Sequence, residues 1–569
     1  MNDLNRNRLV VFLFPLFACL LPQLTFADKA VGTRGAIATV QPIATEAGLS
    51  VLNSGGNALD AAVAAALMLG VVDSHNSGLG GGCFVLIRRP NGDIIAIDGR
   101  EEAPAAAHRD MYLREGRAVP ELSQTGPMAI GIPGALAAYD AALKASGTRT
   151  ITELIRPAIG VARKGFRIDR VMAGNILRTV EAIKRFPATA SILLDSDGHP
   201  YSEGDKLVQE DLATTYQAIA DHGVDWFYQG DFCERTEAWM KVNGGLIKAA
   251  DFAAYKPVQR EPIVTTYRGH TVYGFPPPSS GGIHVSQILN ILENFDVRKI
   301  HAEDPAGFVH LVVEAMKLAF ADRAHWLGDA DYARVPRGLV DKRYAAQLAK
   351  QIDLGKSLDV RSHGLPPNWE EEVYGKHTTH IAAADDTGMF VAITATINTS
   401  FGSKVVIPGT GLVLNNEMDD FSAQPGTPNA FGLLGAENNA IAPGKRPLSS
   451  MSPTIIVKDG EPVMTLGAAG GPKIITATLL AIIRRIDLQM SAQDAVRSAR
   501  FHHQWRPDTL FLESNMAKSV VNSLAVRKHH VEFLESAGLL QAIVRECVDG
   551  GYQLTAISDP RVPGRAGAR

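Results

Sequence analysis

The chain has 569 residues, a formal net charge of −4, 46% hydrophobic residues and 20% charged residues. This composition is that of a globular protein, and the length is several times that of one ordinary domain, so a large core is available. Lysine and arginine are scattered along the chain, which excludes the basic patch expected of a nucleic-acid-binding protein.

The cysteine and histidine content excludes two other classes of protein. Four cysteines are too few for a disulfide framework: Cys19, Cys83, Cys233 and Cys547. Neither a Cys-x-x-Cys nor a His-Glu-x-x-His pattern occurs, so the sequence implies no bound metal.

The first 27 residues have the pattern of a secretory signal. Two arginines in Met1–Arg8 precede an apolar run, Leu9–Leu21, and small residues lead to Ala27. We expect cleavage after Ala27, because prolines interrupt the span that a retained membrane helix would need. The prediction is export to the periplasm or the medium, with no stable membrane span.

Helical patterns alternate with two β-rich zones. Helices are predicted over Ala44–Leu52, Ala58–Leu69, Ile283–Leu292 and Ala306–Trp326, and residues 150–260 are mostly helical in pattern. This alternation predicts an α/β (α+β) fold with sheets sandwiched between helical layers.

A glycine-rich run, Gly78–Cys83, invites a nucleotide-binding interpretation. The dinucleotide fingerprint requires a third glycine where Cys83 stands, and a helix after it. Instead, Phe84–Ile87 and Ile94–Ile97 flank Asn91-Gly92, which is a strong hairpin signal. We therefore reject cofactor binding and expect these glycines to permit close approach of backbone segments.

A second hairpin is predicted from Ile381 to Asn398, around a turn at Asp385–Gly388. Side chains alternate faces along a strand, so Thr394, Thr396 and Asn398 are expected to share one face. Threonine favours strands in any case, so this pattern alone indicates packing rather than a site.

Four irregular segments complete the pattern. Pro276–Gly282 is predicted to open a helix with Ser280 as its N-cap, since no nucleophile elbow surrounds this serine. A polar segment, Arg361–Tyr374, reads as an exposed linker compatible with a cleavage site. The loop Ser422–Arg446 is long enough to be functional or disordered. Gly467–Pro472 joins a strand to a helix, and such a turn can present N–H groups to an anion.

Six motifs give the chain a resemblance to the gamma-glutamyltransferase (glutathione hydrolase) family of N-terminal-nucleophile hydrolases. In order, they are Asp98–Glu101, Pro276–Gly282, Thr378–His380, Asn415–Phe421, Pro447–Met451 and Phe501–Trp505. The resemblance runs from about Gly35 to Arg561. It implies a four-layer αββα sandwich of the N-terminal-nucleophile hydrolase type.

The resemblance also implies a precursor that cleaves itself between His377 and Thr378. A signal peptide (1–27) would precede a large subunit (28–377) and a small subunit (378–569), which together form one αββα unit. Cleavage would free the α-amine of Thr378, with an ordinary pKa near 8, to act as base for the hydroxyl of the same residue.

Roles for other residues follow from the resemblance. Thr396 would orient Thr378, and the N–H groups of Gly470 and Gly471 would stabilise an oxyanion. The substrate is assigned to two sets of side chains: Arg100, Ser449 and Ser450 for its α-carboxylate, and Asn398, Glu417 and Asp420 for its α-amino group. The loop Ser422–Arg446 would cover the pocket, Asp419 would brace its neighbours, and His502 and His503 would belong to a buried network.

The activity implied is cleavage of γ-glutamyl amides such as glutathione, with transfer of the acyl group from Thr378 to water, amino acids or peptides. No cofactor is implied. Two alternatives are a cephalosporin (glutaryl) acylase on the same scaffold and an unprocessed envelope protein that binds γ-glutamyl compounds. Glu417 and Asp420 argue against the first, since a glutaryl group has no α-amine.

Overall fold

A computed structural model of the chain describes residues 28–367 and 380–569. The predicted signal and the predicted cleavage pair, His377 and Thr378, lie outside the described residues.

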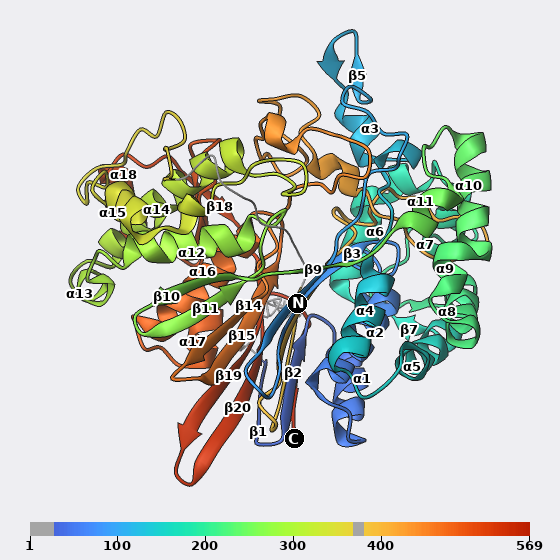
Figure 1. The fold of residues 1–569 in the computed structure, drawn as a ribbon, viewed down its shortest axis with the longest axis horizontal. Coiled ribbons are helices and arrows are strands. Elements are labelled where there is room, and N and C mark those ends of the chain that lie inside the picture. The colour runs from blue at the N-terminus through green and yellow to red at the C-terminus, as the bar shows by residue number, and fades with distance from the viewer. Residues whose placement is uncertain (1–27, 368–379) are drawn as a thin grey trace, which may run out of the picture.

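Two seven-stranded antiparallel sheets form the centre of the molecule (Figure 1). The first sheet has the order β1 (Asp28–Gly32), β20 (Gly551–Ser558), β19 (Leu539–Val548), β15 (Glu461–Ala469), β14 (Thr454–Lys458), β11 (His270–Gly274) and β10 (Ile263–Tyr267). The second has the order β21 (Arg565–Ala568), β2 (Gly35–Thr39), β12 (Ile381–Asp385), β13 (Phe390–Thr396), β3 (Gly82–Arg88), β4 (Ile94–Gly99) and β9 (Val258–Arg260).

Helices cover the outer face of each sheet. The second sheet packs against α1 (Pro42–Asn53), α2 (Ala58–Val72) and α4 (Ala135–Ser146). The first sheet packs against α12 (Gly281–Leu292) and α16 (Lys473–Ile486), and α14 (Pro305–Trp326) lies on α12. Each helix–sheet interface has its own buried apolar cluster, and a third cluster lies between the sheets. The predicted four-layer αββα fold is confirmed.

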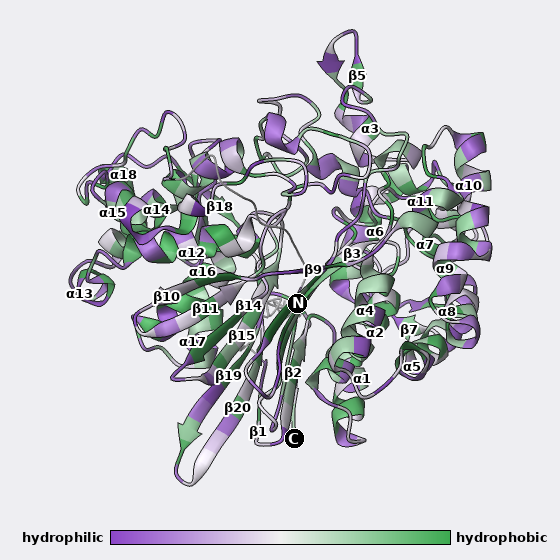
Figure 2. Ribbon diagram, viewed as in Figure 1, coloured by the Kyte–Doolittle hydropathy of each residue, from purple (hydrophilic) through white to green (hydrophobic). Residues whose placement is uncertain are grey.

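The hairpin β12–β13 shows how the sequence pattern creates these layers. Odd-numbered residues such as Val391 and Ile393 enter the cluster against the helices, while even-numbered ones such as Ala392 enter the cluster between the sheets. The strands pair with Ile381 opposite Ile393, as the predicted hairpin requires. Figure 2 shows that hydrophobic residues predominate along the central strands.

Both sheets combine strands from before and after the gap at residues 368–379. In the second sheet, β12 and β13 lie between β2 and β3, and in the first, β15 and β14 lie between β19 and β11. The chain on either side of the predicted cleavage position therefore contributes to the same two sheets.

Smaller elements complete the structure. A third sheet has the order β16 (Phe501–His502), β17 (Leu510–Glu513) and β18 (Val531–Leu534). Residues 150–260 are mostly helical, as predicted, and include α5 (Ile151–Lys164). Among the described helices, none is long and apolar enough to cross a membrane. Cys83, Cys233 and Cys547 are not joined in disulfides.

Candidate active site

A cavity of about 270 Å³ lies where the two sheets end beneath the loop Ser422–Arg446. Eight of the predicted site residues line it: Thr396, Asn398, Glu417, Asp420, Ser449, Ser450, Gly470 and Gly471. Arg100 is fully buried beside the cavity and contacts two of these residues, whereas Thr378 lies outside the described residues.

The end of β13 brings Thr396 and Asn398 to the cavity in different ways. Thr396 is the last strand residue, and its Oγ1 accepts a hydrogen bond from the N–H of Asn398 at 2.7 Å. Asn398 lies beyond the strand with φ of +76°, so the expectation that it continues the strand face is wrong. Asn and Asp tolerate this left-handed conformation better than other non-glycine residues. Its Nδ2 donates to the carbonyl of Asn416 at 3.0 Å.

The glycine run packs beneath this strand end. A Cβ on Gly81 would lie 1.8 Å from the carbonyl oxygen of Thr396, and one on Gly80 would lie 2.0 Å from that of Val413. The predicted close approach of backbone segments is therefore confirmed. Just before this run, Asn76 lines the cavity and its carbonyl accepts from the N–H of Ile397 at 3.1 Å. Sequence analysis missed Asn76. The available signal was its position just before the glycine-rich run.

Two carboxylates and one guanidinium form the most strongly charged part of the site. Nη2 of Arg100 donates to Oδ2 of Asp420 at 2.8 Å, and its Nη1 pairs with Glu417. Burial raises the pKa of Glu417 well above its usual range and that of Asp420 to about 6, although Arg100 opposes both shifts. Oε2 of Glu417 is buried and has no hydrogen-bond partner among the described residues. This oxygen can accept a hydrogen bond from a ligand.

Ser449 and Ser450 are held from the opposite side by Ser280 and Arg323. Ser280 is the N-cap residue of α12, as predicted, but its hydroxyl donates to the carbonyl of Ser449 at 2.7 Å and makes no capping hydrogen bond to the helix. Arg323 donates from Nε to Oγ of Ser280 at 3.1 Å and from Nη2 to Oγ of Ser450 at 3.4 Å. The motif Pro276–Gly282 thus holds Ser449 and Ser450 in place.

Arg323 is the second functional residue that sequence analysis missed. It lies in α14, is buried, and its pKa is lowered to about 10 by that burial. The available signal was the occurrence of several polar residues in a helix that is otherwise apolar, and these residues are Glu314, Lys317, Asp322 and Arg323.

Gly470 and Gly471 form the turn between β15 and α16. Their φ values are +125° and +60°, which residues with a Cβ rarely adopt. A Cβ on Gly471 would lie 2.8 Å from the ring of Phe431, so the covering loop rests directly on this turn. The predicted strand–turn–helix arrangement is confirmed.

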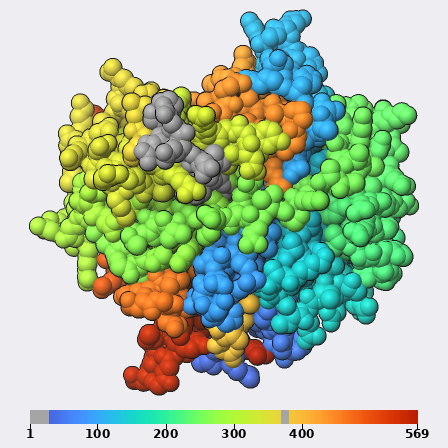
Figure 3. Space-filling model, in the orientation of Figure 1, coloured from blue at the N-terminus to red at the C-terminus, as the bar shows by residue number. Residues whose placement is uncertain are grey.

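The loop Ser422–Arg446 is irregular apart from a short 3₁₀ turn, Glu437–Asn439, and contributes Phe431 to the cavity. Asp419 accepts from the hydroxyl of Ser123 at 2.6 Å and from the N–H of Ala430 at 2.9 Å, which agrees with its predicted bracing role. Farther along, Arg109 pairs with Glu437 at 2.9 Å. In Figure 3 the orange segment that includes this loop adjoins the blue one at the upper face.

The histidines of the motifs are buried and neutral. His502 contacts Thr476 through Nδ1 at 2.8 Å and Gln504 through Nε2 at 3.0 Å, and burial lowers its pKa to about 3. His380 has its Nδ1 3.4 Å from Oγ1 of Thr394, and burial lowers its pKa to about 3 as well. The prediction of a buried network at His502 is confirmed.

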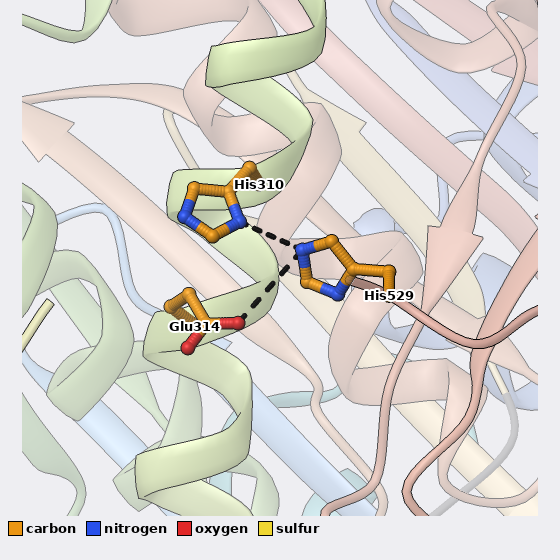
Figure 4. Close-up of side chains that lie close together, drawn as sticks. All are labelled: His310, Glu314 and His529. Atoms are coloured by element: carbon orange, nitrogen blue, oxygen red, sulfur yellow. Dashed lines mark hydrogen bonds and ion pairs between the residues drawn. The ribbon is translucent and has the colours of Figure 1, made fainter. Parts of the chain in front are cut away.

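One buried cluster outside the site has ligand types suited to a metal: His310, Glu314 and His529 (Figure 4). Nδ1 of His310 and Nε2 of His529 are already hydrogen-bonded at 2.7 Å. Lys317 donates to Oε1 of Glu314 at 3.2 Å, and the N–H of Leu358 donates to Oε2 at 2.8 Å. A neighbouring ammonium opposes a cation, so these groups act as a hydrogen-bonded network joining α14 to the C-terminal part of the chain.

Comparisons with known proteins agree with this geometry. The sequence profile described as gamma-glutamyltranspeptidase matches residues 44–568. The glutathione hydrolase proenzyme of Escherichia coli (strain K12) is 42% identical over 533 residues, which cover 93% of this chain and 90% of that protein. The acylase ACY 1 proenzyme of Pseudomonas sp. (strain SE83) is 37% identical, with 88% of each covered.

Two solved structures resemble the fold. Cephalosporin acylase from Bacillus halodurans superposes with a TM-score of 0.85 at 25% identity, covering 98% of this chain and 99% of that one. Gamma-glutamyltranspeptidase from Helicobacter pylori gives a TM-score of 0.54 at 40% identity, covering 55% of this chain and 90% of that one.

Proposed function

This chain belongs to the gamma-glutamyltranspeptidase family, and on that premise we propose that it is a self-processing γ-glutamyltransferase and glutathione hydrolase. It cleaves γ-glutamyl amides, glutathione among them, and passes the γ-glutamyl group to water, an amino acid or a peptide. The precursor cuts itself between His377 and Thr378, giving subunits 28–377 and 378–569. Residues 1–27 direct export.

The observation that carries this proposal is the pair of carboxylates in the cavity wall. Oε2 of Glu417 is buried and has no hydrogen-bond partner within residues 28–367 and 380–569, and Asp420 lies beside it on the same cavity. An α-ammonium group supplies further donors and a second positive charge, since the one guanidinium of Arg100 is shared among Glu417, Asp420 and Glu101. Asn398 would add an amide oxygen as a further acceptor.

The carboxylate end of the substrate is assigned to the serine pair. The hydroxyls of Ser449 and Ser450 can donate to a carboxylate, and Arg323 behind Ser450 adds a buried positive charge. Arg100 was predicted to serve this end, but its guanidinium is engaged with Glu417 and Asp420. We therefore assign Arg100 an indirect role, in which it holds the two carboxylates in place.

In the proposed reaction the α-amine of Thr378 takes the proton of the Thr378 hydroxyl, which attacks the γ-carbonyl carbon. Thr396 orients this residue. The N–H groups of Gly470 and Gly471 stabilise the oxyanion, a contribution commonly of about 3 kcal/mol per donor. The C–N bond then breaks, the amine leaves with the proton, and a γ-glutamyl ester remains until water or a second amine attacks it.

The second candidate is a glutaryl acylase, which the acylase relatives and the Bacillus halodurans structure bring into consideration. Glutaryl and γ-glutamyl groups differ by the α-amine. Retention of Glu417 and Asp420 in the cavity favours the γ-glutamyl group, because burying both carboxylates without a cationic ligand is costly. The parent enzyme should hydrolyse a γ-glutamyl anilide faster than the matching glutaryl anilide. The reverse order would favour the acylase.

Intact mass spectrometry tests the processing step. The parent should give two polypeptides that meet at His377 and Thr378, and the Thr378→Ala variant should give one uncut chain without activity. The mass of the first polypeptide also tests removal of residues 1–27. A parent that stays uncut while it hydrolyses γ-glutamyl anilide would refute the N-terminal-nucleophile mechanism.

A further inference from the structure

A buried lysine lies directly behind one wall of the active-site cavity. Lys404 is 8% exposed, and its ammonium group donates to Oγ1 of Thr399 at 3.1 Å and to the carbonyl of Gly402 at 2.6 Å. Thr399 and its neighbour Ser400 line the cavity. Lys404 has no role in the reaction proposed above, although burying an ammonium group costs free energy.

The backbone from Asn398 to Lys404 has an unusual conformation. Three residues of this turn that carry a Cβ have positive φ values, which are +76° at Asn398, +57° at Phe401 and +65° at Lys404. Such conformations cost free energy and persist only where surrounding contacts enforce them. The N–H of Gly402 donates to the carbonyl of Thr399 at 2.8 Å, and the ammonium group of Lys404 binds both of these residues. Lys404 is therefore one of the contacts that enforce the turn.

The ammonium group of Lys404 is charged at neutral pH. Burial lowers the pKa of Lys404 to about 8, although Glu121 and Asp419 oppose this shift. An ammonium group has three donors and no acceptor, so every oxygen that it contacts must accept. Its two hydrogen bonds within the described residues go to neutral oxygens, those of Thr399 and Gly402.

Lys404 fixes the direction of the Thr399 hydroxyl. Because Oγ1 of Thr399 accepts from Lys404, its own hydrogen goes either to Oδ1 of Asn416, at 3.1 Å, or to the carbonyl of Gly402, at 3.4 Å. The contact with Gly402 is the longer one, and this carbonyl already accepts from Lys404 at 2.6 Å. The hydroxyl of Thr399 therefore donates to Asn416.

Asn416 connects this turn to the substrate-binding residues. Its Oδ1 accepts from both the N–H and the hydroxyl of Thr399, each at 3.1 Å, and its carbonyl accepts from Nδ2 of Asn398 at 3.0 Å. With Nδ2 held in this way, Oδ1 of Asn398 is the amide atom left to accept from a substrate. Asn416 also directly precedes Glu417 in the chain. Both side chains proposed above to bind the α-amino group, Asn398 and Glu417, therefore adjoin the contact of Thr399 with Asn416.

We propose that Lys404 is a positioning residue for recognition of the substrate α-amino group. It acts through Thr399 and Asn416, which fix the amide of Asn398 and the start of the segment that carries Glu417. The inference rests on the proposed function, because it takes the α-amino group to bind these two side chains. The loss of Lys404 should therefore weaken binding only of substrates that have an α-amine.

The test compares a γ-glutamyl anilide with the matching glutaryl anilide, which lacks only the α-amine. Lys404→Met should raise the KM for the γ-glutamyl anilide about fivefold, as for the loss of one hydrogen bond, with little change in kcat. The KM for the glutaryl anilide should stay unchanged. Lys404→Arg keeps the charge and the donors and should recover most of the loss.

Lys528 provides a matched control for the backbone. It lies just after α18 (Lys518–Val526) with a φ of +71°, but its side chain is exposed. Lys404→Gly and Lys528→Gly both place a glycine where φ is positive, a conformation that glycine adopts without strain. Only Lys404→Gly should raise the KM for the γ-glutamyl anilide. Thermal unfolding reports the folding of each variant, and Lys404→Gly serves for the comparison of anilides if Lys404→Met does not fold.

Thr399→Val tests the route through the hydroxyl. Alone it should raise the KM for the γ-glutamyl anilide about as much as Lys404→Met, and the double variant should show no further rise, because both changes remove the same arrangement. A double variant whose two losses multiply would overturn the inference.

Two other results would overturn the inference alone. One is a folded, active Lys404→Met enzyme that has the parent's KM for the γ-glutamyl anilide, and the other is an equal rise in KM for both anilides. A parent without γ-glutamyl hydrolase activity would overturn the proposed function and this inference with it.

Discussion

Arg100 and Asp420 are separated by 320 positions in the chain, yet Nη2 of Arg100 lies 2.8 Å from Oδ2 of Asp420 next to the active-site cavity. The same guanidinium pairs with Glu417. One buried cation therefore faces two buried carboxylates, and burial still raises the pKa of both acids. A ligand that brings a second positive charge stabilises their ionised forms.

This arrangement predicts a pH dependence of donor binding. The ammonium group of the donor binds the ionised form of Asp420, whose pKa is about 6, so kcat/KM should fall as the pH decreases below about 6. Below this pKa the slope should approach tenfold per pH unit, as for one titrating group. A profile of kcat/KM for anilide hydrolysis against pH measures this slope. Asp420→Asn should lower kcat/KM and flatten the acid limb, and an unchanged limb would assign it to another group.

Glu417 is expected to set the choice between γ-glutamyl and glutaryl substrates. Glu417→Gln keeps an acceptor for Arg100 but removes a charge that faces the donor ammonium, so the KM for γ-glutamyl anilide should rise at least about tenfold. The KM for glutaryl anilide should change little. Glu437→Gln makes the same chemical change at an exposed position in the loop and should leave both unchanged. Equal losses for both substrates would indicate a general disturbance of the site.

The same substitution, glycine to alanine, is expected to have opposite effects on the free energy of unfolding at Gly81 and at Gly160. A Cβ at Gly81 would lie 1.8 Å from a backbone oxygen, and Gly81→Ala should lower the free energy of unfolding by about 3 kcal/mol and impair activity. Gly160 lies inside α5 with nothing within 4 Å of its Cβ position. Gly160→Ala should therefore stabilise the fold, by up to about 1 kcal/mol. Denaturant unfolding measures both, and equal effects would contradict the packing argument.

Arg323 is expected to act through Ser450. Arg323→Met should raise the KM of the donor several-fold with a smaller effect on kcat, because the lost contact positions a binding hydroxyl. Arg323→Lys should recover part of the loss, as lysine keeps the charge without the forked geometry. Arg298→Met, at an exposed position on α13 (Val297–Glu303), is the control. A loss in kcat alone would contradict a binding role.

The local sequence pattern predicted the helices and strands well, but it did not predict which side chains contact one another. The hairpin from Ile381 to Thr396 was predictable because strand alternation and an Asp/Gly turn leave one register. The contact between Arg100 and Asp420 was not predictable, because no short-range pattern reports a contact across 320 positions. Arg323 and Asn76 were missed because their sequence neighbours indicate only burial and a turn, and their place at the site results from tertiary packing.

Because strands from both sides of the proposed cut alternate in the two large sheets, the cut should make unfolding of the protein hard to reverse. Before the cut, formation of these sheets is a unimolecular process, since one chain supplies every strand. After it, neither polypeptide contains every strand of either seven-stranded sheet, and reassembly from separated polypeptides becomes a bimolecular step that depends on concentration. The mature enzyme should therefore recover poorly from complete denaturation at low concentration, and its persistence would depend on the rate of unfolding rather than on an equilibrium.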